Sequence, residues 1–269
     1  MAHYYYYILC AMPKLRLAER NRPNVKSFLE TRGHLILKEE WEEIKLLLLK
    51  NDCLNFFAIL SEQESHIPLG IFSREQLEEG MKKSLGLPEF MLNFIPLFKS
   101  NQIEKADPLD GLLEGYYHYA LERGCPFLQE WLTFERDLHN IVAGLRAKKL
   151  NLEPEKFILN QNDTSQLILK NFSSPDFAVG KKYPWLSELM IIMDAEDPIV
   201  LERKLDEIKW DRLEQMTRYI YFRSEVLISY FIKLIILERW LKVQPEKAEQ
   251  ILDITLTDLK SKEVVSSEQ

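Results

Sequence analysis

Five acidic and histidine side chains fall at spacings that could bring them together on two neighbouring helices. Glu114, His118 and Glu122 are four residues apart in turn, which places them on one helix face, and Glu135 and His139 repeat that spacing further along. Glutamates and histidines that converge between helices are the ligands of di-metal carboxylate sites. The sequence therefore offers one constellation for redox chemistry, that of a di-metal helical-bundle oxidoreductase.

The details of this spacing differ from those of di-metal bundles. Such sites ordinarily place Glu and His three residues apart and repeat the pairing on a second helix pair. Neither feature occurs in this sequence. Polar residues that face solvent or a partner at ordinary helical spacing are the simpler interpretation. We therefore predict no catalytic residue, no cofactor and no metal, and keep the five side chains as metal-site candidates only.

The three cysteines predict neither a disulfide framework nor a zinc site. Cys10, Cys53 and Cys125 lie far apart, are odd in number and form no Cys-x-x-Cys pair, which fits a reducing compartment. Cys125 falls at the expected start of a helix, where the helix dipole could lower its pKa. Its sequence neighbours supply no base, so a structural thiol is expected.

Motifs for nucleotide, ester or metal-dependent hydrolysis are missing from the sequence. It contains no glycine-rich phosphate loop, no Gly-x-Ser-x-Gly elbow, no His-Glu-x-x-His helix and no calcium loop. The formal net charge is −7, with acidic and basic residues interspersed. Phosphate backbones are attracted by basic fields, and none is present here. We expect neither ATP nor nucleic acid as a ligand.

The elements that carry these residues are expected to be helices almost throughout, so the predicted fold class is all-α and multihelical. Apolar residues recur at helical spacings of three and four. The clearest stripe begins at Pro126 and comprises Phe127, Trp131, Phe134, Leu138, Ile141 and Leu145. Only Tyr4 to Cys10 is β-prone, and it predicts a short N-terminal strand or else the start of a helix that Pro13 stops.

Capping residues and prolines mark the expected helix starts. Ser73 and Gln76 form a capping box for a helix that should run to about Ser84. Asp197 precedes Pro198 as a cap before a first-turn proline. Three further helices are expected to begin at first-turn prolines, namely Pro88, Pro108 and Pro126.

Domain boundaries are expected where the helical pattern weakens. The pattern breaks near Asn151 to Pro154, and Asn160 to Ser174 is rich in Asn, Gln, Ser and Thr. The tail has the composition of a disordered segment. We therefore expect an N-terminal helical lobe or lobes at 1–150, a connecting segment at 151–182, a C-terminal helical lobe at 183–260 and a disordered tail at 261–269.

One stretch, Glu225 to Val243, approaches the length of a membrane span. Lys233, Glu238 and Arg239 interrupt its apolar run, and charges at bilayer depth are costly. We expect a buried core helix instead. The N-terminus lacks the residue order of a secretory signal, so a cytoplasmic protein without a membrane span is predicted.

Three stretches resemble components of V-type (A/V-type) ATP synthases. FERDLHNIVAGLRAKKLNLEPEKF, at Phe134 to Phe157, and Ser224 to Leu252 resemble the C-type central-stalk subunit, which is called the d-type subunit in eukaryotic enzymes. The opening YYYYILCAMPKLRL, at Tyr4 to Leu17, resembles a divergent bacterial family found among these components. The second stretch matches through two paired elements, Tyr230 with Lys233 and Glu238 with Trp240.

The resemblance implies an all-helical socket of three similar lobes. Such a socket receives the rotating shaft, formed by subunits D and F, on its inner surface and sits on the membrane ring of a proton- or sodium-translocating complex. It has no active site and is present in one copy per complex, at the inner face of the membrane. This chain is shorter than the usual member, so the presence of all three lobes stays open.

The leading hypothesis from the sequence is therefore a non-catalytic central-stalk subunit that couples the shaft to the membrane ring. Two alternatives remain. One is the di-metal oxidoreductase, and the other is an unrelated helical scaffold protein.

Overall fold

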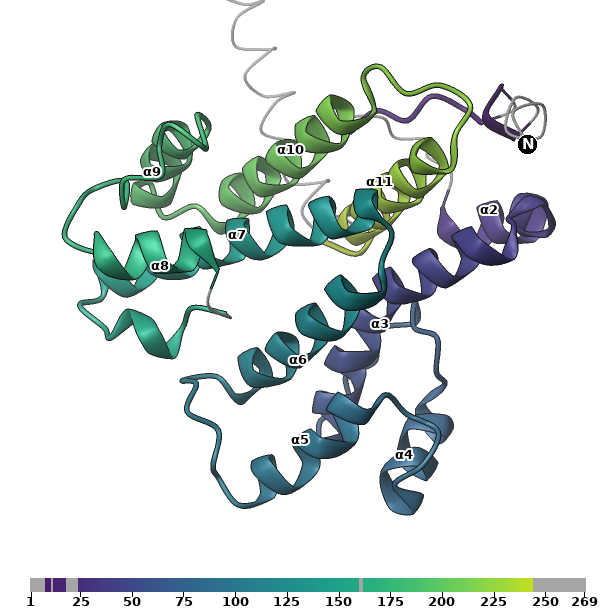
Figure 1. The fold of residues 1–269 in the computed structure, drawn as a ribbon, viewed down its shortest axis with the longest axis horizontal. Coiled ribbons are helices and arrows are strands. Elements are labelled where there is room, and N and C mark those ends of the chain that lie inside the picture. The colour runs from purple at the N-terminus through teal and green to yellow at the C-terminus, as the bar shows by residue number, and fades with distance from the viewer. Residues whose placement is uncertain (1–7, 11, 18–23, 160–161, 244–269) are drawn as a thin grey trace, which may run out of the picture. The chain divides into compact units, whose positions relative to one another are not determined.

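The structure is a computed structural model, and it describes residues 8–10, 12–17, 24–159 and 162–243 of the 269-residue chain. The described residues form helices joined by loops, and no strand occurs among them (Figure 1). The prediction of an all-α, multihelical fold is confirmed. The chain divides into two compact units, one of Leu37–Arg218 and the other of Met1–Ile36 with Tyr219–Gln269.

The larger unit packs its longest helices around α6 (Pro108–Arg123). This helix contacts both α3 (Lys38–Leu60) and α7 (Pro126–Lys149), and α5 (Glu89–Lys99) packs against it as well. The fully buried aromatic core includes Phe56, Tyr116, Tyr117 and Trp131. The remaining helices are α4 (Arg74–Lys83), α8 (Asp163–Lys170), α9 (Leu186–Asp194), α10 (Pro198–Thr217) and the short 3₁₀ helix η2 (Pro154–Lys156).

Several helices of this unit begin where the capping residues predict. The Ser73 hydroxyl accepts from the Gln76 amide at 3.2 Å, and the Gln76 side chain accepts from the Ser73 amide at 2.8 Å, so the predicted capping box is present. Asp197 accepts from two amides of the first turn of α10. Helices α6 and α7 begin at their prolines, whereas Pro88 is itself the cap and α5 begins one residue later.

Helices α3 and α7 each hold the loop that follows them through a buried asparagine. The Asn55 amide donates to the Ile67 carbonyl at 2.9 Å and accepts from the Ile67 amide at 2.7 Å. Asn140 makes the same pair of bonds with Leu159, at 2.8 and 2.7 Å. A side-chain amide with one donor and one acceptor satisfies both polar groups of a backbone unit in this way.

An aspartate three residues earlier completes each arrangement. Asp52 accepts from the backbone amides of Ile71 and Phe72. Asp137 accepts from the side-chain amide of Asn162 at 2.7 Å and from the Thr164 hydroxyl at 2.9 Å. Both loops then end in a capping box, at Ser73 before α4 and at Asn162 before α8. The larger unit thus contains two copies of one arrangement. In each, the Asp and Asn of an Asp-x-x-Asn sequence on a helix bind the following loop, and a helix that begins with a capping box comes after that loop. We call this arrangement the asparagine clamp.

The predicted connecting segment at 151–182 lies inside the larger unit and links no two domains. Its polar residues are bonding partners of α7, because Asp137 binds Asn162 and Thr164. Lys148 of α7 also donates to the carbonyls of Ser173 and Ser174. Asn, Ser and Thr are common in linkers and in side-chain clamps alike, so composition misplaced the boundary.

The smaller unit joins the two ends of the chain. It contains α2 (Val25–Arg32), the 3₁₀ helix η1 (Gly33–Leu35) and α11 (Ser224–Val243). Phe28 packs against Tyr230, with ring centroids 5.6 Å apart, and Glu238 accepts from the Val25 amide at 3.2 Å. The C-terminal lobe predicted at 183–260 is therefore divided, because its last described helix packs with N-terminal residues and α9 and α10 belong to the larger unit.

Helix α11 contains the apolar stretch that begins at Glu225, and most of its described apolar side chains are buried. Leu227, Ile228, Phe231 and Ile232 are buried. Within the described residues, no helix has the length and hydropathy that crossing a bilayer requires. Of the β-prone Tyr4 to Cys10 stretch, Ile8 to Cys10 is helical, and the rest lies outside the described residues, as does the tail predicted at 261–269.

Candidate functional site

The structure separates the metal-site candidates of α6. Glu114 forms an ion pair with Lys105 at 2.9 Å, at the edge of a groove described below. His118 and Glu122 lie 3.3 Å apart on an exposed surface, with 75% and 55% of their side chains accessible. The i, i+4 spacing thus produces a surface pair of the ordinary kind, whose contribution to stability is small.

The candidates of α7 are partly buried in the larger unit, with 16% of the Glu135 side chain and 36% of the His139 side chain exposed. Glu135 pairs with Lys50 of α3 at 3.0 Å and accepts from the Tyr117 hydroxyl at 3.3 Å. His139 Nε2 lies 3.7 Å from an Asp110 carboxylate oxygen. Among the residues that the structure describes, no three His, Cys, Asp or Glu side chains are grouped so as to hold a metal ion. The five candidates are thus distributed among separate pairs.

The partly buried surroundings of Glu135 and His139 shift the pKa values of both side chains. Burial alone would raise the pKa of Glu135, but the nearby Lys50 and Lys209 ammonium groups outweigh it, and the pKa is lowered. Burial and the charge of Lys50 lower the pKa of His139 to about 4. Glu135 is therefore held as the anion of an ion pair, and His139 is neutral at pH 7.

The cysteine thiols are held in their protonated forms. Cys53 is completely buried, and burial raises its pKa far above the ordinary value. Burial also raises the pKa of Cys125 to about 11, although this residue caps the start of α7. Neighbouring Glu43 accepts a hydrogen bond from the Cys125 amide at 2.9 Å and opposes a thiolate. Neither environment activates a nucleophile.

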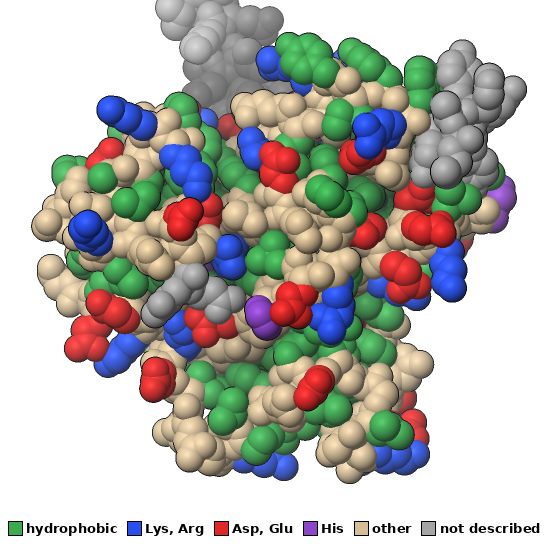
Figure 2. Space-filling view, in the orientation of Figure 1, with side chains coloured by type: hydrophobic (Ala, Val, Ile, Leu, Met, Phe, Trp, Pro, Cys, Tyr) green, Lys and Arg blue, Asp and Glu red, His purple; other side chains and the backbone are tan. Residues whose placement is uncertain are grey.

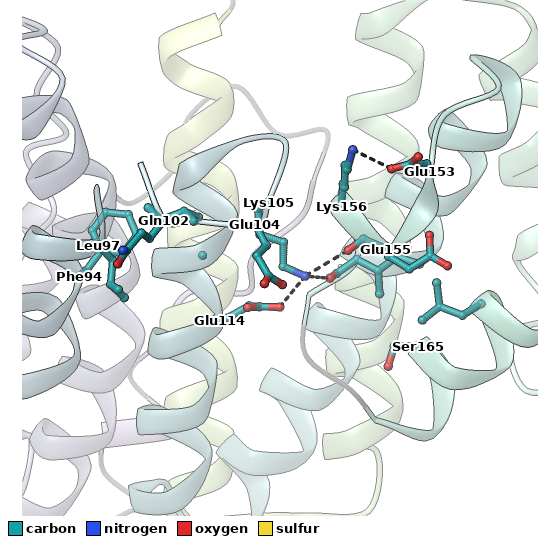
Figure 3. Close-up of a pocket in the computed structure, with 14 residues that line it drawn as sticks. Phe94, Leu97, Gln102, Glu104, Lys105, Glu114, Glu153, Glu155, Lys156 and Ser165 are labelled. Atoms are coloured by element: carbon teal, nitrogen blue, oxygen red, sulfur yellow. Dashed lines mark hydrogen bonds and ion pairs between the residues drawn. The ribbon is translucent and has the colours of Figure 1, made fainter. Parts of the chain in front are cut away.

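A groove of about 1050 Å³ opens in the larger unit between α5, the start of α6, η2 and α8 (Figure 3). Its apolar lining consists of Phe94, Leu97, Ile103, Ile158 and Leu169. Its charged lining consists of Glu104, Lys105, Glu114, Glu153, Glu155 and Lys156. Four glutamates and two lysines give this lining a negative balance, and we call this feature the acidic groove.

Lys105 joins the two sides of the acidic groove. Its ammonium group pairs with Glu114 of α6 and donates to the Ile158 carbonyl at 2.5 Å, across the groove (Figure 3). The Ala106 amide also donates to the Lys156 carbonyl at 3.0 Å. The loop before α6 is thereby tied to the loop after α7, so the groove is preformed by the fold.

A second hollow of about 730 Å³ lies between α7, α9 and α10. Its cations are all paired, Lys182 with Asp137, Lys204 with Glu188 and Arg212 with Glu130, at 3.3, 2.5 and 2.6 Å. The aromatic rings of Phe134 and Trp185 also line it. The Lys204 and Arg212 pairs connect α10 to α9 and α7, and the Lys182 pair connects a loop to α7, which is a structural use of charge.

Sequence reasoning missed the acidic groove. Glu114 was singled out, but as a metal ligand, and Leu97, Glu104 and Glu155 carried no motif. The groove gathers residues between positions 94 and 169 from separate elements. No local spacing could have indicated it, because which elements come together is settled by packing.

The fold is all-helical, with side-chain clamps that tie loops to α3 and α7 and a partly buried ion pair between Lys50 of α3 and Glu135 of α7. The chain belongs to the family described as protein of unknown function (DUF2764), which matches residues 1–262. It is 22% identical over 229 residues to an uncharacterized protein of Chlamydia muridarum (strain MoPn / Nigg), covering 81% of this chain and 84% of that protein. An uncharacterized protein of Chlamydia trachomatis serovar D is 22% identical over 239 residues, covering 84% and 89%. No solved structure matches the chain.

Proposed function

We propose that the chain is a non-catalytic central-stalk subunit of a V-type ATP synthase or ATPase. The observation that carries the proposal is the repeated asparagine clamp. The stretch that resembles the C-type central-stalk subunit, Phe134 to Phe157, contains Asp137 and Asn140, and the same arrangement recurs at Asp52 and Asn55. A family built of similar helical lobes is expected to repeat such an arrangement, which supports the resemblance.

The contacts of the second resembling stretch support the same reading. Tyr230 packs on Phe28, and Glu238 accepts from the amide at the start of α2. These residues hold a lobe together, as expected of a protein that acts through its shape. The interior polar groups likewise serve packing, since Glu135 binds Lys50 and Tyr117.

The proposal names partners and a location. The chain would couple the rotating shaft of subunits D and F to the membrane ring, in one copy per complex, at the cytoplasmic face of the membrane. Its surface offers both signs of charge for docking: Figure 2 shows acidic and basic side chains interspersed over the face drawn, with apolar side chains between them. Complementary charge of this kind steers and orients association.

The test is reconstitution of the complex. The full chain is expressed with subunits D and F of a V-type ATP synthase from the same source and passed over a size-exclusion column at low salt. We expect the three proteins to comigrate at micromolar concentrations. Separate elution would contradict the central-stalk proposal. Elemental analysis of the same preparation tests the oxidoreductase alternative, since about one or two iron or manganese ions per chain would favour a di-metal site.

A further inference from the structure

The acidic groove has the anatomy of a surface that binds a protein segment. Phe94 and Ile158 form a buried apolar floor, and Leu97 is 44% exposed beside them. The exposed charged side chains, Glu104, Glu153, Glu155 and Lys156, lie at its edges, whereas the mostly buried Lys105–Glu114 pair crosses the groove (Figure 3). Small-molecule pockets ordinarily contain a few polar groups that converge on the ligand. Exposed apolar surface bordered by charged side chains is instead typical of protein interfaces and of grooves that receive amphipathic helices.

The rim of the groove retains negative charge after its own ion pairs are counted. Lys105 pairs with Glu114, and Lys156 pairs with Glu153 at 2.7 Å. The side chains of Glu104 and Glu155 are exposed and form no ion pair with any residue in the described part of the chain. Two carboxylates at the rim of an apolar groove favour a partner that carries cations.

We propose that the acidic groove binds a protein partner through a basic amphipathic helix. Apolar side chains of that helix, spaced three and four residues apart, pack on Leu97 and the floor of the groove. Its lysine or arginine side chains pair with Glu104 and Glu155. The groove is tied open by Lys105, so binding requires little rearrangement of this chain.

The inference deepens the proposed function and rests on it in one respect, that the chain acts by binding other proteins. It does not require the partner to be the shaft. Failure of comigration with subunits D and F would leave the binding of a basic helix to the groove unaffected. Conversely, a groove that binds no basic helix would leave comigration through another surface intact.

The test measures binding of a labelled synthetic peptide to the full chain by fluorescence anisotropy. The probe is a helical peptide of about 18 residues, or five turns, with leucine on one face and lysine on the other, and the matched peptide carries glutamate in place of lysine. We expect the lysine peptide to bind with a micromolar Kd and the glutamate peptide to bind at least about tenfold more weakly. Absence of binding by the lysine peptide would overturn the proposal.

Variants of the chain locate the binding site. Leu97→Glu places a charge on the apolar surface, and the double variant Glu104→Lys with Glu155→Lys reverses the unpaired rim. Each should raise the Kd of the lysine peptide about tenfold or more, as loss of a central anchor or of a charge pair does. All three residues are exposed, so the variants should fold, which circular dichroism checks.

Matched controls separate the groove from general attraction to an acidic protein. Ile191→Glu changes an apolar residue of α9 that is 71% exposed and lies outside the groove. Glu64→Lys with Glu214→Lys changes the net charge by the same amount as the rim variant. Both controls should leave the Kd within about twofold. Equal weakening by control and groove variants would show non-specific binding and refute the proposal.

Discussion

The imidazole of His139 is held neutral by its surroundings, which links stability to pH. Its pKa in the unfolded chain is 6.5, and burial and Lys50 lower it to about 4 in the fold. Between pH 4 and pH 6.5, His139 is largely protonated in the unfolded state but largely neutral in the folded state. His139 therefore favours the folded state fully above pH 6.5, and this contribution is lost as the pH falls to 4.

We expect His139→Gln to remove this pH dependence. The free energy of unfolding of the unaltered chain should decline relative to the variant by about 1 kcal/mol between about pH 7 and pH 4.5, a value reduced for the partial exposure of the ring. Urea unfolding followed by circular dichroism at several pH values measures the difference. Parallel curves for the two proteins would show that His139 titrates normally in the fold.

The His139→Gln variant is needed for comparison because two aspartates change the stability with pH in the direction opposite to His139. Burial raises the pKa of Asp52 and of Asp110 to about 6 from 3.8. A folded state with a raised carboxyl pKa binds the proton first, so the stabilisation from these groups is present at low pH and declines as the pH rises from about 4 to about 6. The pH profile of the unaltered chain is the sum of both effects.

Two adjacent tyrosines allow the stability contribution of a hydrogen-bonded buried hydroxyl to be compared with that of an unbonded one. Tyr116 and Tyr117 are both almost completely buried. The Tyr117 hydroxyl donates to Glu135 and accepts from Lys50, whereas the Tyr116 hydroxyl has no hydrogen-bond partner among the described residues. A buried polar group without a partner carries a desolvation cost that removing it relieves.

We expect the two phenylalanine substitutions to differ in sign. Tyr116→Phe should leave stability unchanged or raise it by up to about 1 kcal/mol, and Tyr117→Phe should lower it by about 1–2 kcal/mol. Thermal unfolding of both variants measures the contrast. Equal destabilisation by both changes would mean that Tyr116 has a partner and would contradict the expectation.

At the level of secondary structure elements, the asparagine clamps are expected to be equivalent. Asn55→Ala and Asn140→Ala each remove two hydrogen bonds and leave a backbone amide and carbonyl without partners, at the part-buried Ile67 and the buried Leu159. Each should lower the free energy of unfolding by about 2–4 kcal/mol. Chemical denaturation measures these changes.

Asn171→Ala is the control for the clamps. Its side chain donates one exposed hydrogen bond to the Leu167 carbonyl at the end of α8, so its loss should cost less than about 1 kcal/mol. A clamp variant no less stable than this control would contradict the structural role of that clamp. Unequal losses of unfolding free energy for Asn55→Ala and Asn140→Ala would show that the two clamps contribute differently to stability.

For the whole molecule, the division of the chain predicts an independently folding fragment. Leu37–Arg218 is continuous and contains the aromatic core, both clamps and the Lys50–Glu135 pair. The other unit is assembled from the two chain ends, so deleting either end removes part of it. We expect the fragment 37–218 to show a helical circular dichroism spectrum and a cooperative thermal transition. A non-cooperative transition would contradict this division.

Helix boundaries were predictable because they depend on neighbours in the chain. The Ser73 box, the Asp197 cap and the prolines at the starts of α6 and α7 act within one turn, and each is found in the structure. The all-α class follows from the same local signals together with the apolar stripe of α7. The strand predicted at Tyr4 to Cys10 is wrong for Ile8 to Cys10, which are helical, and the rest of that stretch and the tail lie outside the described residues.

The partners of these helices were not predictable, because spacing along a helix defines a face but not what packs against it. Asp137 and Asn140 belong to a recognisable stretch, yet their roles depend on a loop that returns to α7. The boundary at 151–182 failed for this reason, since its Asn, Ser and Thr residues bind α7.

The same limit applies to the site. Glu114 and Glu135 have helical spacings that fit a metal cluster, but packing brings Lys105 to one and Lys50 to the other, and the acidic groove results from separate elements that meet in space. Local sequence thus sets which segments are helical through short-range hydrogen bonding. Long-range burial sets which side chains meet, and with them the surfaces available for function.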